Sequence, residues 1–105
     1  MILLKTMTSK MNDRTAEIFD ALSHPLRLTI VRMLDSHTEM HVNDIRERSK
    51  YAISNPGLSI HLGKLLKAGI VKKRQEGTKV FYSLSDKATL YLQVIAAADD
   101  IGAKK

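Results

Sequence analysis

Cysteine is absent from the 105-residue chain, and so is tryptophan. Without thiols the protein has no disulfide framework, no thiolate metal site and no redox-active or nucleophilic cysteine. No apolar run approaches the roughly 20 residues that a membrane-spanning helix requires. A glycine-rich phosphate loop, a paired-carboxylate arrangement and a local Ser-His-Asp pattern are also missing, so we do not expect an enzyme. The hydrophobic fraction of 44% indicates a globular chain.

The charge of the chain is positive and unevenly placed. A formal net charge of +6 favours an acidic partner, with nucleic acid as the first candidate and an anionic membrane surface as the second. Residues 54–82 carry a net +5, because Glu76 is opposed there by six basic residues: Lys64, Lys67, Lys72, Lys73, Arg74 and Lys79. A solvated charged face is one explanation, but this local excess favours a phosphate-facing surface.

Hydrophobic spacing predicts a mainly α chain of the α+β class, with one domain at this length. Helices are expected over residues 12–22, 25–35, 43–49, 54–68 and 86–101, with a polar loop over 36–41. Four helix starts have capping residues, namely Asn12, Ser23 or His24 before Pro25, Ser54 or Asn55 before Pro56, and Ser85 or Asp86 before the last helix. Gly69 suits the left-handed position that ends a helix.

A change from helical to two-residue periodicity follows Gly69. Residues 70–75 and 78–84 are predicted to form a β-hairpin with a basic tip, its turn at Glu76-Gly77. Phe81 and Tyr82 lie at strand spacing, which favours sheet and core packing over stacking on bases. The last predicted helix is apolar nearly all round, so one of its sides is expected to pack on a second copy.

The predicted domain covers residues 12–105, preceded by a flexible N-terminal arm over residues 1–11. Met7 and Met11 are alternative starts to Met1. The opening apolar stretch is too short for an export signal and no small-residue cleavage site follows it, so we expect a cytoplasmic protein. The expected order of four helices, a hairpin and a final helix is that of a winged helix-turn-helix.

Three motifs follow one another along this order. Residues 19–34 contain FxxLSHPxRLxIVxxL, residues 54–62 read SNPGLSIHL, and residues 65–82 contain LxxAGIV and then KRQEGTKVFY. Together, over residues 14–98, they resemble the ArsR/SmtB family of bacterial and archaeal repressors. The resemblance implies a homodimer, an operator with two-fold symmetry and repression by occlusion of a promoter. It places the dimer contact on the first and last helices, at Ile18, Phe19, Leu90, Tyr91, Val94, Ile95 and Ala98.

The helix over residues 54–68 is expected to lie in the major groove of DNA. Its candidate contacts are Ser54, Asn55, Gly57, Ser59, Ile60, His61 and Lys64. Ser54 and Asn55 are equally suited to capping, and Gly57 would let the backbone approach closely. Ile60 stands where many relatives have a polar base reader, so it either contacts a thymine methyl or weakens readout there. His61 is either a base contact or a packed structural histidine.

Phosphate contacts are expected from the hairpin and the end of that helix, at Lys67, Lys72, Lys73, Arg74 and Lys79. Arg74 and Lys79 are predicted to reach phosphates or a minor groove, with a solvated hairpin as the alternative. The connection at residues 49–52 is about two residues longer than the family's usual turn, which could tilt the recognition helix.

The family's usual sensor residues are missing. The common metal site on the last helix needs histidine, and that helix offers only Asp86, Asp99 and Asp100. His37, Glu39 and His41 are legitimate zinc or nickel ligands, but their spacing matches no family site and a polar loop is the alternative. We therefore predict no metal, no cofactor and no small-molecule ligand.

The sequence and the family resemblance thus predict a dimeric repressor that binds a palindromic double-stranded DNA operator, with repression of its own gene as one option. Its recognition helix would lie in the major groove and its basic hairpin on the backbone. A winged-helix protein-interaction module and a DNA-binding activator remain as alternatives.

Overall fold

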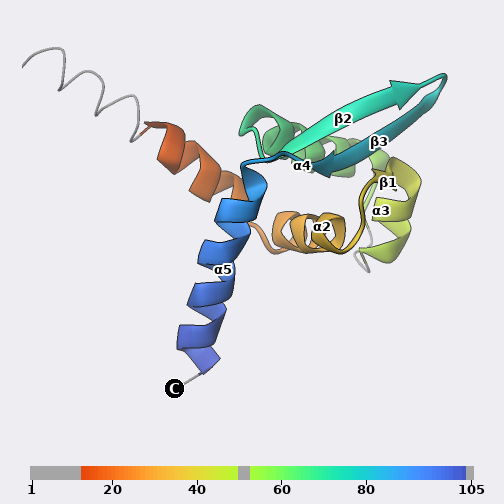
Figure 1. Ribbon diagram of the computed structural model, residues 1–105. Coiled ribbons are helices and arrows are strands. Elements are labelled where there is room, and N and C mark those ends of the chain that lie inside the picture. Colours follow the sequence, from red (N-terminus) through yellow and green to blue (C-terminus); the bar gives the residue numbers. More distant parts are fainter. Residues whose placement is uncertain (1–12, 50–52, 104–105) are drawn as a thin grey trace, which may run out of the picture.

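The computed structural model describes residues 13–49 and 53–103, so the predicted arm and the Asn12 cap lie outside it. A helix over residues 13–22 comes first. It is followed by α2 (Pro25–Ser36), β1 (Met40–His41), α3 (Val42–Arg48), α4 (Asn55–Lys67), β2 (Val71–Glu76), β3 (Lys79–Leu84) and α5 (Ala88–Ala103) (Figure 1). The fold is a helix-rich winged helix-turn-helix, in which α3 and α4 form the helix-turn-helix and β2–β3 the wing.

Local capping fixes where α2 and α4 begin and end. The backbone N–H of Leu26 donates to Nδ1 of His24 at 3.1 Å, which makes His24 the N-cap of α2 ahead of Pro25. The N–H of Gly57 donates to Oγ of Ser54 at 3.2 Å, so Ser54 caps α4. Gly69 adopts φ +76° after α4, the left-handed conformation that glycine reaches without strain.

The core forms where α2, α3 and α4 meet the base of the sheet. Its members with exposed fractions of 3% or less are Ala21, Leu26, Ile30, Val31, Leu34, Ile45, Leu58, Leu62, Leu65, Ile70, Val71 and Ala88. The α4 members recur at spacings of four and three, so one side of that helix is committed to the core. Its opposite side therefore faces solvent.

The sheet has a strand that the sequence did not predict. Residues 36–41 were expected to form a loop, and that prediction is wrong for Met40 and His41, which form β1. Met40 pairs with Tyr82 and His41 with Phe81, and the antiparallel sheet has the order β1-β3-β2. Since β1 runs directly into α3, that helix begins at Val42, with the His41 side chain accepting from the N–H of Asn43 at 3.1 Å.

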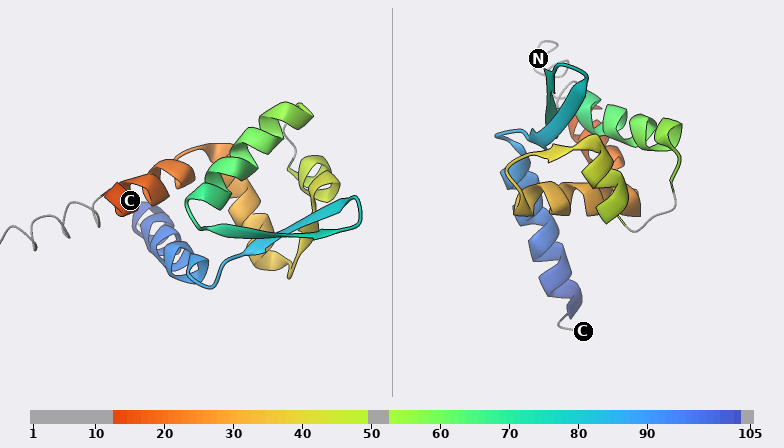
Figure 2. Two further views of the ribbon diagram at one scale, coloured as in Figure 1. Left: turned by 90° about the horizontal axis from the view of Figure 1, so that it is seen from above. Right: turned by 90° about the vertical axis from the view of Figure 1, so that its right-hand side faces the viewer.

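The elements separate into two ends of the molecule. The helix over residues 13–22 and α5 lie together at the end opposite the tip of the wing, as the views of Figures 1 and 2 both show. The wing extends from the body past α3 (Figure 2). Within the described residues, no helix is long and apolar enough to span a membrane.

Candidate nucleic-acid interface

The solvent-facing side of α4 carries most of the side chains predicted to read bases. Ser54, Asn55, Ser59, Ile60 and Lys64 are exposed, and Ile60 has an exposed fraction of 61%. An isoleucine this exposed on a helix beside a complete core is not held there by packing. Ile60 is therefore available for an apolar contact such as a thymine methyl.

The two residues that start α4 have different partners. Ser54 is the N-cap, whereas the Oδ1 atom of Asn55 accepts a hydrogen bond from Nη1 of Arg46. Arg46 belongs to the last turn of α3, so this bond joins the two helices of the helix-turn-helix. Arg46 is not among the residues predicted from the sequence, because no local pattern shows that a residue of α3 meets the start of α4. Residues 50–52 of the long connection lie outside the described residues.

His61 is half-buried and contacts the start of α2. Its ring centroid lies 4.5 Å from that of His24, and its Nδ1 lies 3.1 Å from Nη1 of Arg27. Arginine has only donors, so Nδ1 accepts and the neutral ring carries its proton on Nε2. Burial lowers the pKa of His61, and the charges of His24, Arg27 and Lys64 lower it further. The neutral histidine is thus the form that this packing favours.

Arg27 is buried, with 5% of its surface exposed, and it joins three elements. Its Nε donates to the carbonyl of Ala21 at 2.5 Å and its Nη2 to the carbonyl of Asp20 at 3.1 Å. Both carbonyls end the helix over residues 13–22, while the third contact is to His61 on α4. The side chain therefore links the predicted dimerisation helix to the recognition helix.

The lysines of α4 and of the wing are free to meet an anion. Lys64, Lys67, Lys72, Lys73 and Lys79 are exposed, and none forms an ion pair with another residue in the described part of the chain. Such unpaired cations are the groups that bind phosphates and release counterions.

Arg74 differs from these lysines because carboxylates occupy its guanidinium. Nη2 and Nε donate to Oε1 and Oε2 of Glu39 at 2.7 and 3.0 Å, and Nη1 donates to Oε2 of Glu76 at 2.8 Å. The guanidinium carbon also lies 4.7 Å from the ring centroid of Phe81. The bonds to Glu39 raise the pKa of Arg74 and lower the pKa of that carboxyl group. The sequence pattern indicates Glu39 only as a metal ligand and does not predict that it pairs with Arg74.

The three residues weighed as metal ligands are each engaged separately. His37 donates from Nδ1 to the carbonyl of Met33 at 2.8 Å and accepts from Arg48 at 3.2 Å. Glu39 binds Arg74, and His41 caps α3. Across residues 13–49 and 53–103, no three His, Asp or Glu side chains gather in a way that could hold a metal ion.

The structure describes the side chains of five of the seven predicted dimerisation residues. Phe19 and Leu90 have exposed fractions of 57% and 61%, and Ala98 is also exposed. Ile18 and Tyr91 are half-buried against the core. Val94 and Ile95 lie on α5, but their side chains fall outside the described residues. Two large apolar residues are therefore exposed on the elements that lie opposite the tip of the wing.

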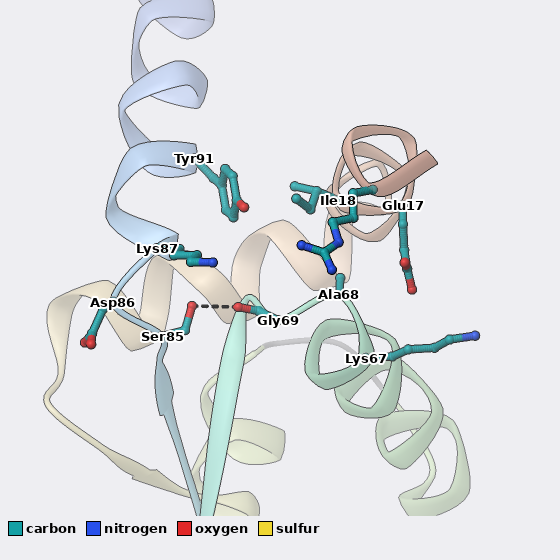
Figure 3. Close-up of a pocket in the computed structure, with 10 residues that line it drawn as sticks. Glu17, Ile18, Lys67, Ala68, Gly69, Ser85, Asp86, Lys87 and Tyr91 are labelled. Atoms are coloured by element: carbon teal, nitrogen blue, oxygen red, sulfur yellow. Dashed lines mark hydrogen bonds between the residues drawn. The ribbon is translucent and has the colours of Figure 1, made fainter. Parts of the chain in front are cut away.

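A cavity of about 530 Å³ lies between the helix over residues 13–22, the start of α5 and the end of α4. Ile18 and Tyr91 face one another across it, as Figure 3 shows, and the end of α4 forms its floor. Oγ of Ser85 donates to the carbonyl of Gly69 at 2.7 Å (Figure 3), which joins the start of the α5 segment to the end of α4.

Comparisons with known proteins agree with this geometry. Residues 22–74 match the family model of a helix-turn-helix domain. An HTH-type transcriptional regulator of Methanocaldococcus jannaschii is 43% identical over 74 residues, which are 70% of this chain and 81% of that protein. A biofilm growth-associated repressor of Agrobacterium fabrum is 36% identical over 83 residues, covering 78% of this chain and 68% of the repressor.

A solved structure gives the same result. The homodimeric winged helix-turn-helix DNA-binding domain of a possible ArsR-family regulator from Mycobacterium bovis matches with a TM-score of 0.81 and 27% identity. The match covers 93% of this chain and 90% of that one. The chain therefore belongs to the ArsR/SmtB-like family of winged helix-turn-helix transcriptional repressors.

Proposed function

We propose that the protein is a dimeric repressor that reads an inverted-repeat operator with α4 in the major groove and the wing on the backbone. The observation that carries this proposal is the exposed side of α4, where Ser59, Ile60 and Lys64 face solvent beside unpaired lysines. Polar and apolar groups on the helix would read base edges, and the lysines would neutralise phosphates.

The dimer would form through the helix over residues 13–22 and α5. Phe19 and Leu90 are the large apolar side chains exposed at that end, and exposed apolar groups of this size suit an interface. The solved Mycobacterium bovis relative is homodimeric. Two-fold symmetry would place the recognition helices about 34 Å apart, one turn of duplex, which fits an inverted repeat.

Repression is the regulatory role proposed for this dimer. Relatives that cover most of the chain carry the name repressor, including those of Agrobacterium fabrum and Bacillus anthracis. An operator that overlaps the promoter of the protein's own gene would make it an autorepressor. An activator would differ only in where its operator lies relative to the promoter.

Charge reversal tests the proposed interface directly. Lys64→Glu on α4 and Lys79→Glu on the wing should each weaken binding to the upstream DNA by more than tenfold at low salt, because a phosphate contact becomes a repulsion. Lys87→Glu, exposed beside the start of α5, is the matched control and should retain binding.

Repeating the binding measurements over a range of salt concentrations distinguishes DNA binding from protein docking. The logarithm of affinity should fall linearly with the logarithm of salt concentration, by about 0.9 for each phosphate contacted. Equal binding by all three variants, or affinity that is flat between low and physiological salt, would contradict the DNA-binding interface and favour a protein-interaction module.

A further inference from the structure

Glu39 and Arg74 form an ion pair that the proposed DNA interface does not require. Arg74 lies on the wing, two residues before Glu76 at its tip, where a cation would be expected to meet a phosphate. Glu39 is 35 positions away in the sequence and occupies the guanidinium through two parallel hydrogen bonds. With Glu76 also bonded to Arg74, the three side chains together carry a net charge of −1.

The sheet register explains how these residues meet. Phe81 on β3 pairs with His41 on one side and with Arg74 on the other. Glu39 directly precedes β1, two residues before His41, and its hydrogen bonds to Arg74 bring its carboxylate to this same face. On this face the ring of His41 makes a T-shaped contact with Phe81, with the centroids 5.4 Å apart. The guanidinium of Arg74 stacks on the same Phe81 ring. The carboxylate of Glu39 therefore reaches Arg74 past β3.

The ion pair is accessible to a competing anion. The side chains of Arg74, Glu39 and Glu76 are 51%, 31% and 71% exposed. A guanidinium binds carboxylate and phosphate with the same two-pronged geometry. An exposed ion pair is weak because solvent screens its charges, so a DNA phosphate can replace the carboxylate.

We infer that Glu39 competes with the DNA backbone for Arg74 and thereby sets the affinity of the wing for its operator. This inference rests on the proposed function, because it assumes that the wing meets DNA. In the free protein Glu39 holds Arg74 over Phe81, and on binding a phosphate takes its place. The hydrogen bonds between Glu39 and Arg74 must break before the phosphate binds, and this cost keeps affinity below what the wing would otherwise reach.

A double-mutant cycle on the full chain tests the competition. The probe is a fluorescent duplex of about 30 base pairs from the DNA upstream of the gene, three turns of helix. Glu39→Gln keeps the size of the side chain and removes its charge, so it should tighten binding by roughly two- to fivefold. Arg74→Gln should weaken binding, and Glu39→Gln added to Arg74→Gln should change the affinity by less than 1.5-fold.

Asp35→Asn is the matched control, because it removes one negative charge from an exposed position at the end of α2. Glu39→Gln overturns the inference if it matches Asp35→Asn, weakens binding, or tightens it equally with Arg74→Gln present. In that last case general repulsion, and not competition for Arg74, would be the cause. Failure of the wild-type protein to bind any duplex would instead contradict the proposed function.

Discussion

Replacing Arg27 with methionine should destabilise the fold far more than its single position suggests. The guanidinium makes three hydrogen bonds, to the carbonyls of Asp20 and Ala21 and to His61, while only 5% of the residue is exposed. Methionine fills a similar volume but removes the donor that Arg27 offers to the carbonyl of Ala21 and to Nδ1 of His61. The carbonyl of Asp20 loses the same donor but still accepts from the N–H and the hydroxyl of Ser23. Buried acceptors that lose a charged donor cost about 1.5–3 kcal/mol each, offset in part by no longer burying a charge.

We therefore expect Arg27→Met to lower the free energy of unfolding by about 2–4 kcal/mol. For a domain of this size, the thermal midpoint should then fall on the order of 10–20 °C. Urea unfolding followed by circular dichroism measures the free energy, and a thermal scan measures the midpoint. Arg14→Met, on an exposed arginine of the helix over residues 13–22, is the control and should change the free energy by less than about 0.5 kcal/mol.

The contacts of Arg27 also predict which helices its replacement should affect. Arg27 joins the helix over residues 13–22 to α4 through His61, so hydrogen exchange should speed up in both helices of the variant. An Arg27→Met protein as stable as Arg14→Met would show that the three bonds contribute nothing net. The account of Arg27 as the link between these helices would then be wrong.

Three further predictions concern pH, assembly and the end of α4. Burial and then neighbouring positive charges lower the pKa of His61, so its contribution to stability should be full above about pH 6.5 and decline as pH falls below it. In His61→Asn the thermal midpoint should fall less between pH 7.5 and 5 than in the wild type, and an equal fall would show that His61 is not the cause. Leu90→Asp should convert the proposed dimer to a monomer, whereas Thr89→Asp at the neighbouring position should not, as measured by sedimentation velocity. If both variants remain dimers, the proposed α5 interface is wrong. Gly69→Ala should lower the free energy of unfolding by about 1 kcal/mol because φ is +76°, whereas Gly63→Ala in the middle of α4, with open space around its added Cβ, should raise it by about 0.5–1 kcal/mol. Urea unfolding measures both changes, and changes of the same sign would refute the conformational explanation.

Local signals in the sequence were sufficient to predict the main elements of the fold. Pro25 and Pro56 near helix starts, capping side chains before them and Gly69 after α4 all act within a few residues. Their effect therefore depends little on the rest of the chain, and the observed bounds of α2 and α4 lie close to the predicted ones. Strand β1 has only two residues, too few for a two-residue period to show, and it forms because β3 offers it an edge.

The candidate site depends on contacts that no local pattern reveals. Arg27 meets His61 across 34 positions, and Arg74 meets Glu39 across 35. The excess of basic residues predicts a phosphate-facing surface, but it does not show which cations the fold neutralises. Arg74 was counted with the lysines for this reason. The structure separates it from them, because its carboxylate partner comes from the segment before β1.

Selection of bound duplexes from a random DNA library tests the central claim most directly. The full-length protein is incubated with the library at moderate salt, and the retained duplexes are sequenced. The account predicts enrichment of an inverted repeat whose half-sites have centres about 10 base pairs apart, matching two α4 helices one turn of duplex apart. Retained duplexes with the same sequence composition as the input library would contradict a sequence-reading role for α4.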